Sequence, residues 1–141
     1  MKSTNYTILL IKSFEQLRLN SYLCPAGVWT IGYGHTDGVN RGMLITEKTA
    51  DELLQQDIRN AEHCINQMGA DLTQEQFDAL ISFVFNIGAR GFNVSTIRKK
   101  ILKDPNDPSI ADEFRRWIYA GNEKMPGLIK RREQEIKLYY S

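Results

Sequence analysis

The sequence lacks most features that mark membrane, zinc-binding or disulfide-stabilised proteins. Its two cysteines, Cys24 and Cys64, form neither a CxxC pair nor part of a Cys/His cluster, so we expect reduced thiols and no metal site. The apolar run nearest the N-terminus, residues 8–11, is four residues long. A membrane span needs about 20 apolar residues, and the apolar core of a signal peptide needs about 7 to 15. We therefore expect no stable membrane anchor and no export signal.

No internal repeat, low-complexity tract or Pro/Gly-rich linker divides the 141 residues. Hydrophobic residues make up 42% and charged residues 25% of the chain, as in folded water-soluble domains rather than disordered chains. This length suits one compact domain. We expect a single domain over residues 1–141, with a small lobe from about 15 to 60 and a helical lobe made of 1–14 and about 61–141.

The net charge of +1 hides an uneven distribution along the chain. Residues 1–87 carry 6 basic and 10 acidic side chains, net −4, whereas residues 88–141 carry 12 and 7, net +5. Such a bias fits an anionic partner, which could be cell wall, membrane surface or nucleic acid, and it equally fits a solvated helix face. Because no recognition motif accompanies the charge, a nucleic-acid partner is not expected.

The apolar spacing predicts helices at both ends of the chain and a small sheet between them. A short helix is expected over residues 5–14, and the glycine-punctuated, β-prone stretch from 22 to 45 predicts a small antiparallel sheet with tight turns. A long helix should begin near Thr46. Thr73 and Gln76 form a capping-box pattern ahead of a central helix that Gly88 ends.

Three further helices are expected in the basic part of the chain. They cover residues near 95–103, residues 108–119 with Asp107 as cap and Pro108 at the first helical position, and residues 127–140. The sequence therefore predicts an α+β fold, in which a long helix joins a small antiparallel sheet lobe to a larger helical lobe across a cleft.

Glu15 is the candidate proton donor of this cleft. It leaves a helix end beside Phe14 and Leu17, and partial burial there favours the protonated carboxylic acid. Hydrolysis of a glycosidic bond needs such a donor at the leaving oxygen, together with a second group that activates water or attacks the sugar. Taken alone, a glutamate at a helix end is more often an ordinary surface residue.

The context of Glu15 provides a resemblance. Cys24 follows nine positions later and Thr30 six positions after that, where the heptapeptide Thr-Ile-Gly-Tyr-Gly-His-Thr begins. This segment resembles the active-site signature of phage-type lysozymes, which has a glutamate, an aspartate and a threonine at these positions. The similarity continues through residues 83–88, 92–96 and 127–133, and so covers nearly the whole chain. It implies a lysozyme-like two-lobed fold.

The same resemblance implies the function and the site. The chain would be an endolysin that hydrolyses the β-1,4 bond between N-acetylmuramic acid and N-acetylglucosamine in bacterial peptidoglycan and lyses the host cell. Glu15 would be the acid, Cys24 the second catalytic group and Thr30 the residue that positions water. The implied substrate contacts are Thr36, Phe85 and Ser95. We expect a monomer without cofactor or metal, held in the host cytoplasm until a membrane pore releases it to the periplasm and cell wall.

Cys24 is the departure from the family pattern, because it stands where the family has its aspartate. Three outcomes stay open: Cys24 acts as nucleophile or base, Thr30 and water suffice beside Glu15, or activity is lost and the cysteine is a small apolar filler. We favour an active enzyme, because Glu15, Thr30 and His35 all remain in register. The alternatives are a lytic transglycosylase that uses Glu15 alone and a catalytically impaired peptidoglycan-binding module.

Cys24 and His35 could also suggest a thiol peptidase or amidase. Such enzymes place the cysteine at the start of a helix, whereas Pro25 and Gly27 put Cys24 in a strand or turn. His35 is instead expected to brace the small lobe through a hydrogen bond or ion pair. From the resemblance, Arg131 or Arg132 is expected to reach Glu15.

Overall fold

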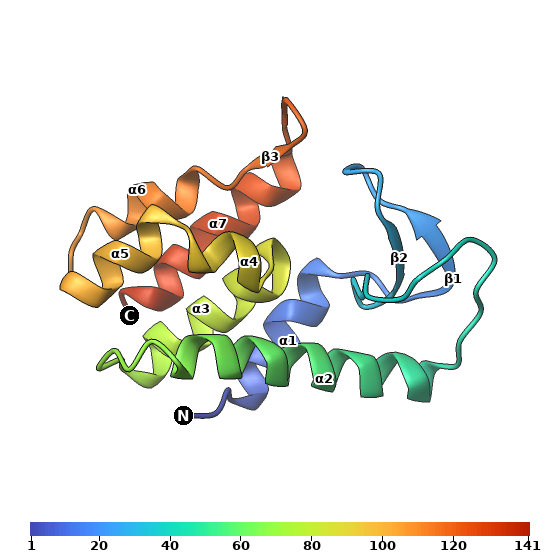
Figure 1. Ribbon diagram of the computed structural model, residues 1–141, viewed down its shortest axis with the longest axis horizontal. Helices are drawn as coiled ribbons and strands as arrows, with labels where there is room; N and C mark the ends of the chain where they lie inside the picture. The colour runs from blue at the N-terminus through green and yellow to red at the C-terminus, as the bar shows by residue number, and fades with distance from the viewer.

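The computed structural model describes residues 1–141 and places a small sheet on one side of the molecule and most helices on the other (Figure 1). The predicted α+β class is confirmed. In chain order the elements are α1 (Asn5–Phe14), β1 (Arg18–Leu23), β2 (Trp29–Gly32), α2 (Glu47–Asn66), α3 (Gln74–Ile87), α4 (Ala89–Asn93), α5 (Thr96–Lys103), α6 (Ile110–Arg115), β3 (Tyr119–Ala120), β4 (Glu123–Lys124) and α7 (Pro126–Tyr139). None of the helices combines the length and apolarity that crossing a membrane requires.

The small sheet is an antiparallel hairpin of β1 and β2, in which Tyr22 lies opposite Thr30. Beyond β2 the chain folds back at once, because the backbones of Ile31 and His35 exchange two hydrogen bonds of 2.9 Å. The predicted sheet with tight turns is therefore confirmed, although β1 begins at Arg18 rather than at residue 22. Its first three residues are exposed, so they carry no alternation of apolar and polar side chains that would mark a strand.

Helix α2 connects the two sides of the molecule, as predicted. The side chain of Thr46 caps it by accepting a hydrogen bond from the backbone N–H of Thr49 at 3.2 Å. Its buried face packs against β2 at one end and against α3 further along, and Figure 1 shows it crossing the lower part of the molecule from the small sheet to the helical side. The residues of that face include Leu54, Ile58, Ala61 and Ile65.

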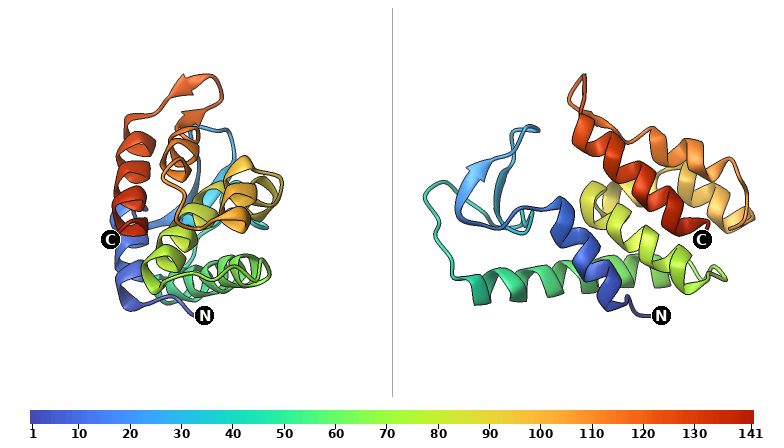
Figure 2. Two further views of the ribbon diagram at one scale, coloured as in Figure 1. Left: turned by 90° about the vertical axis from the view of Figure 1, so that its left-hand side faces the viewer. Right: turned by 180° about the vertical axis from the view of Figure 1, so that it is seen from behind.

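Helix α3 forms the centre of the helical side. The Thr73–Gln76 capping box is present at its start, and Gly88, with φ of 89°, ends it, as predicted. Every residue from Gln76 to Val84 is buried. The reason is that α1, α2, α4 and α7 all pack against α3, and Figure 2 shows α7 lying along it.

The predicted helix over residues 108–119 is wrong in extent, because α6 covers only Ile110–Arg115. Asp107 does not cap it. Its carboxylate instead accepts from the backbone N–H of Ser109 at 2.8 Å in a tight turn. The helix stops early, and Trp117 beyond it packs edge-on against Phe83, with ring centroids 6.0 Å apart. The chain then enters the β3–β4 hairpin, which the sequence analysis did not predict, nor did it predict α4.

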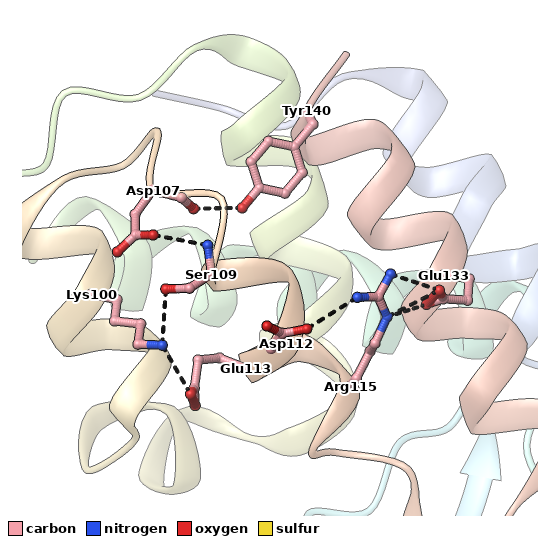
Figure 3. A network of polar contacts seen from close by, with 8 residues as sticks. All are labelled: Lys100, Asp107, Ser109, Asp112, Glu113, Arg115, Glu133 and Tyr140. Atoms are coloured by element: carbon pink, nitrogen blue, oxygen red, sulfur yellow. Dashed lines mark hydrogen bonds and ion pairs between the residues drawn. The ribbon is translucent and has the colours of Figure 1, made fainter.

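Polar contacts fix the short helix α6 between its neighbours (Figure 3). Lys100 of α5 donates to Ser109 at 3.0 Å and lies 3.2 Å from the carboxylate of Glu113. On the other side, Arg115 donates to both carboxylate oxygens of Glu133 on α7. These contacts hold the segment that leads into the β3–β4 hairpin.

His35 joins the turn after β2 to α2 and thereby braces the small lobe, as predicted. Its Nδ1 lies 2.7 Å from Asp57 of α2, and its Nε2 lies 2.9 Å from the backbone oxygen of Asp37. Both ring nitrogens of His35 are therefore engaged, one with α2 and one with the turn. Burial raises the pKa of the Asp57 carboxyl, and the pairing with His35 offsets part of that rise.

Replacing Asp57 should therefore loosen the small lobe. We expect Asp57→Asn to lower the free energy of unfolding by about 1–3 kcal/mol, because His35 loses a charged partner. The control is Asp51→Asn on the same helix, where the exposed pair with Lys12 should contribute less than about 1 kcal/mol. Thermal denaturation at pH 6 measures both, and equal losses would contradict the bracing role.

Candidate active site

A cleft of about 1170 Å³ separates the small sheet from the helical side. One wall comes from the end of α1 and the β1–β2 hairpin, the floor from the end of α3, and the other wall from the segment between α6 and α7 and from α7 itself. The side chains and backbone that line it include Glu15, Tyr22, Cys24, Thr30, Gly34, Thr36, Phe85, Asn86, Arg116, Trp117, Tyr119, Lys130 and Arg131.

Glu15 stands at the point where α1 ends. Its backbone N–H still donates to Ile11 at 2.9 Å, but its own backbone is extended, so the chain turns away from the helix axis. The side chain is 20% exposed. Arg131 of α7 donates to its Oε1 at 2.9 Å, which identifies Arg131 as the arginine that reaches Glu15.

The carboxyl of Glu15 also rests against the backbone of Gly34. A Cβ atom added at Gly34 would lie 2.7 Å from Oε2 of Glu15, closer than real Cβ contacts come. Gly34 has φ of 74°, a conformation that glycine adopts without strain. A bare backbone on one side and a guanidinium on the other therefore fix the carboxyl in the cleft wall.

Cys24 and Thr30 lie in the same wall, on the turn between β1 and β2 and on β2 itself. Cys24 directly follows β1, where its N–H donates to the backbone oxygen of Val28 at 3.0 Å, and its thiol is free and partly exposed. Its predicted place in a strand or turn is confirmed. Thr30 is 4% exposed, and its hydroxyl donates to the same oxygen of Val28 at 3.0 Å. The structure thus brings Glu15, Cys24 and Thr30 to one cleft.

The predicted substrate contacts divide into two groups. Thr36 and Phe85 line the cleft, and Phe85 also packs against the core. Ser95 does not line it. Its hydroxyl caps α5, accepting from the N–H of Arg98 at 3.2 Å and donating to Phe92 at 2.6 Å. The structure therefore gives Ser95 a part in helix capping.

Tyr22 is a cleft residue that the sequence analysis missed. It lies opposite Thr30 in the hairpin, and the guanidinium of Arg18 sits 4.4 Å from the centre of its ring. Burial raises the pKa of its hydroxyl, and the negative charge of Glu15 adds to the rise. Its position opposite Thr30, in the strand that pairs with β2, was the signal that could have found it.

The far wall was also missed, because residues 116–119 were assigned to a helix. The observed chain instead carries Arg116, Trp117 and Tyr119 past the cleft, and α7 adds Lys130. The cleft thus has Trp117, Tyr119 and basic side chains on one wall, and a carboxyl, a thiol, a threonine hydroxyl and the ring of Tyr22 on the other. Such an arrangement can bind a long polar chain and donate a proton to it.

Comparisons with known proteins agree with this geometry. The model of the family described as Phage lysozyme matches residues 12–135. The chain is 44% identical to the endolysin of Acyrthosiphon pisum secondary endosymbiont phage 1 over 95% of this chain and 94% of that one. It is 39% identical to the endolysin of Bacillus phage B103 over 94% of its length, but spans only 51% of that relative.

Among solved structures, the fold resembles the muramidase domain of SpmX from Asticaccaulis excentricus. The TM-score is 0.85 at 35% sequence identity, with 99% of this chain and 98% of that chain covered. The fold of the whole chain, including both walls of the cleft, is therefore lysozyme-like.

Because Glu15 rests against Gly34, we expect Gly34→Ala to displace its carboxyl and to lower the free energy of unfolding by about 2–4 kcal/mol. The matched control is Gly38→Ala. Gly38 also has positive φ, but nothing lies within 4 Å of its added Cβ, so only backbone strain of about 1 kcal/mol is expected. Thermal denaturation compares the two, and equal losses would show that the contact with Glu15 is unimportant.

Proposed function

The chain belongs to the phage lysozyme family, and on this premise we propose that its cleft cuts the β-1,4 bond between N-acetylmuramic acid and N-acetylglucosamine with Glu15 as the acid. The chain is a glycoside hydrolase of the muramidase type, and its function is that of an endolysin that degrades bacterial peptidoglycan. The observation that carries the proposed role of Glu15 is its carboxyl, held in the cleft wall by Arg131 and Gly34.

The walls of the cleft suit a glycan strand that carries acidic peptides. Sugar rings present apolar faces and hydroxyl edges, and the aromatic rings of Trp117 and Tyr119 offer matching surfaces. Arg116 and Lys130 line the same wall and would attract the carboxylates of the peptides. We propose that Thr36 and Phe85 contact the sugars at the floor of the cleft.

In the proposed reaction Glu15 protonates the glycosidic oxygen as the bond between that oxygen and the anomeric carbon breaks. Water supplies the hydroxyl that the anomeric carbon gains, and it gives up one proton. The hydroxyl proton of Thr30 is committed to Val28, so the lone pairs of its oxygen remain available to accept from that water. Thr30 would thereby position the water.

Cys24 takes the place of the second catalytic group in this proposal. Its thiol is partly exposed in the cleft wall on the same hairpin as Thr30. As a thiolate it would accept the proton of the water or attack the sugar, and as a thiol it would only orient the water. Each of these roles needs the sulfur to face the cleft.

The enzyme acts at the bacterial cell wall. We propose that it works as a monomer without a nucleic-acid partner, and that it accumulates in the host cytoplasm before a membrane pore releases it. Every residue with a role in the proposed reaction comes from one chain, so the reaction itself needs no second copy.

Removing the acid tests the proposed function directly. We expect Glu15→Gln to lower the rate of wall clearing at least about 100-fold, because an amide has no proton to give to the leaving oxygen. The control is Glu52→Gln, an exposed position on α2 that should clear at the parental rate. Turbidity of purified peptidoglycan gives the rate, and an unimpaired Glu15→Gln variant would exclude Glu15 as the acid.

The second catalytic group is tested by changing Cys24. We expect Cys24→Ser to slow clearing at least about tenfold and Cys24→Asp to retain activity, because a carboxylate can accept the proton that serine does not. Alkylation should inactivate the native protein and leave Cys24→Ser, which keeps only Cys64, at its own rate. Parental rates for Cys24→Ser and for the alkylated native protein would refute a catalytic thiol.

A further inference from the structure

A cluster of buried charges on α7 reaches Glu15 through Arg131, which lines the cleft. It consists of Arg131, Arg132 and Glu135 on α7, whose side chains are 4%, 0% and 0% exposed. Charged side chains are rarely buried this completely unless they are paired. We call these three residues the α7 charge cluster. Its carboxylate, that of Glu135, has no part in the proposed reaction.

Arg131 connects this carboxylate to Glu15. Its Nη1 donates to Glu15 at 2.9 Å, while its Nε donates to Oε2 of Glu135 at 3.3 Å. Ser82 of α3 fixes the same oxygen of Glu135 through a hydroxyl hydrogen bond of 2.7 Å, and its backbone oxygen accepts from Arg131 at 3.0 Å. Glu15 and Glu135 therefore share a single guanidinium.

Arg132 adds a second positive charge beside Glu135. Its Nε lies 3.2 Å from Oε1 of Glu135 without forming an aligned hydrogen bond, and its Nη2 donates to Asn86 in the cleft floor. Burial lowers the pKa of Arg132 to about 10. Burial also raises the pKa of Glu135, but both arginines oppose the rise. A neutral Glu135 would leave two buried guanidinium groups with Glu15 as their only anion, and the attraction of both arginines favours the ionised carboxylate against the effect of burial.

Charge balance shows what Glu135 does for Glu15. Consider the net charge of the two arginines and the two glutamates together. With Glu135 ionised, this net charge is zero when Glu15 is ionised and +1 when Glu15 is protonated. Without the negative charge of Glu135, the net charge is +1 when Glu15 is ionised and +2 when it is protonated. An additional positive charge favours loss of the proton from Glu15. Glu135 therefore helps Glu15 to keep the proton that the reaction needs.

Stability alone does not account for the cluster. A buried ion pair with imperfect geometry contributes little, because the loss of hydration offsets the attraction. Glu135 Oε1 and Arg132 Nε and Nη1 all lack hydrogen-bond partners. Buried ionisable groups with shifted pKa values are frequent at functional sites.

We propose that Glu135 is a positioning residue, which acts through Arg131 to keep Glu15 protonated and so sets the alkaline limit of activity. The proposal rests on the proposed function in that it takes Glu15 as the acid. Glu135 itself is fully buried and does not line the cleft.

Other titratable and charged groups face Glu15 or the cluster from the neighbouring elements. From the small sheet, Tyr22 and Cys24 face Glu15, and Arg18 stacks on Tyr22. Lys12 of α1 pairs with Asp51. The neighbours on α3, Ser82 and Asn86, carry no charge.

Helix α6 packs against α7, but its charges are engaged in the network of Figure 3. Arg115 pairs with Asp112 and with Glu133, and Glu133 is 48% exposed. Arg116 lies 3.7 Å from Glu113, which also pairs with Lys100. Glu133 therefore offers a matched control, a glutamate two positions from Glu135 on the same helix whose charge faces solvent.

The experiment compares Glu135→Gln with Glu133→Gln, since both remove one negative charge from α7. The readouts are the pH profile of kcat/KM on purified peptidoglycan and the carbon-13 NMR titration of the Glu15 carboxyl. We expect Glu135→Gln to move the alkaline limb and the NMR midpoint down by about one pH unit. Glu133→Gln should leave both within about 0.2 of the parent, because an exposed charge is screened.

A Glu135→Gln midpoint that coincides with that of the parent or of Glu133→Gln would overturn the proposal. If Glu135→Gln does not fold, Glu135→Asp is measured instead. This variant keeps the negative charge but moves it away from Arg131 by about the length of one methylene group. We therefore expect a smaller downward shift of the NMR midpoint of Glu15, and the absence of any shift would overturn the proposal. The NMR titration of the Glu15 carboxyl does not depend on enzyme activity. If Glu15→Gln proved active, the proposed function would be refuted, but the NMR titration would still test whether Glu135 affects the protonation of Glu15.

Discussion

The contact between Arg131 and Glu15 is the constraint on which the site depends. It joins residues 116 positions apart in the chain, and it brings the C-terminal helix to the end of the first one. Gly34, from the turn after β2, closes the opposite side of the carboxyl. Three distant segments must therefore fold correctly before Glu15 is oriented. The acid is a product of the tertiary structure, although its own helix is local.

The two walls of the cleft contribute different things to the reaction. In the proposed reaction the hairpin of β1 and β2 provides the thiol of Cys24 and the hydroxyl of Thr30, while Arg131 of α7 contacts the carboxyl of Glu15. The distance between the walls is set by α2, which packs against both sides, and by the attachment of His35 to Asp57.

Much of this arrangement could be predicted from the sequence, because local patterns determine it. The cap at Thr46 and the capping box at Thr73 fixed the starts of α2 and α3, and the spacing from Glu15 to Thr30 marked one wall of the cleft. The opposite wall could not be predicted. Trp117 leaves the helical pattern to pack against the core, and such tertiary contacts override local propensity. The buried Glu135 looked like an ordinary polar residue of a helix.

In the proposed function, the cleft adds water across a glycosidic bond. Digestion of purified peptidoglycan in water labelled with heavy oxygen, followed by mass spectrometry of the fragments, measures this step directly. Hydrolysis predicts N-acetylmuramic acid at every new reducing end, with one heavy oxygen in each. Fragments that end chiefly in anhydro sugars without the label would contradict it, because their ring closes without water.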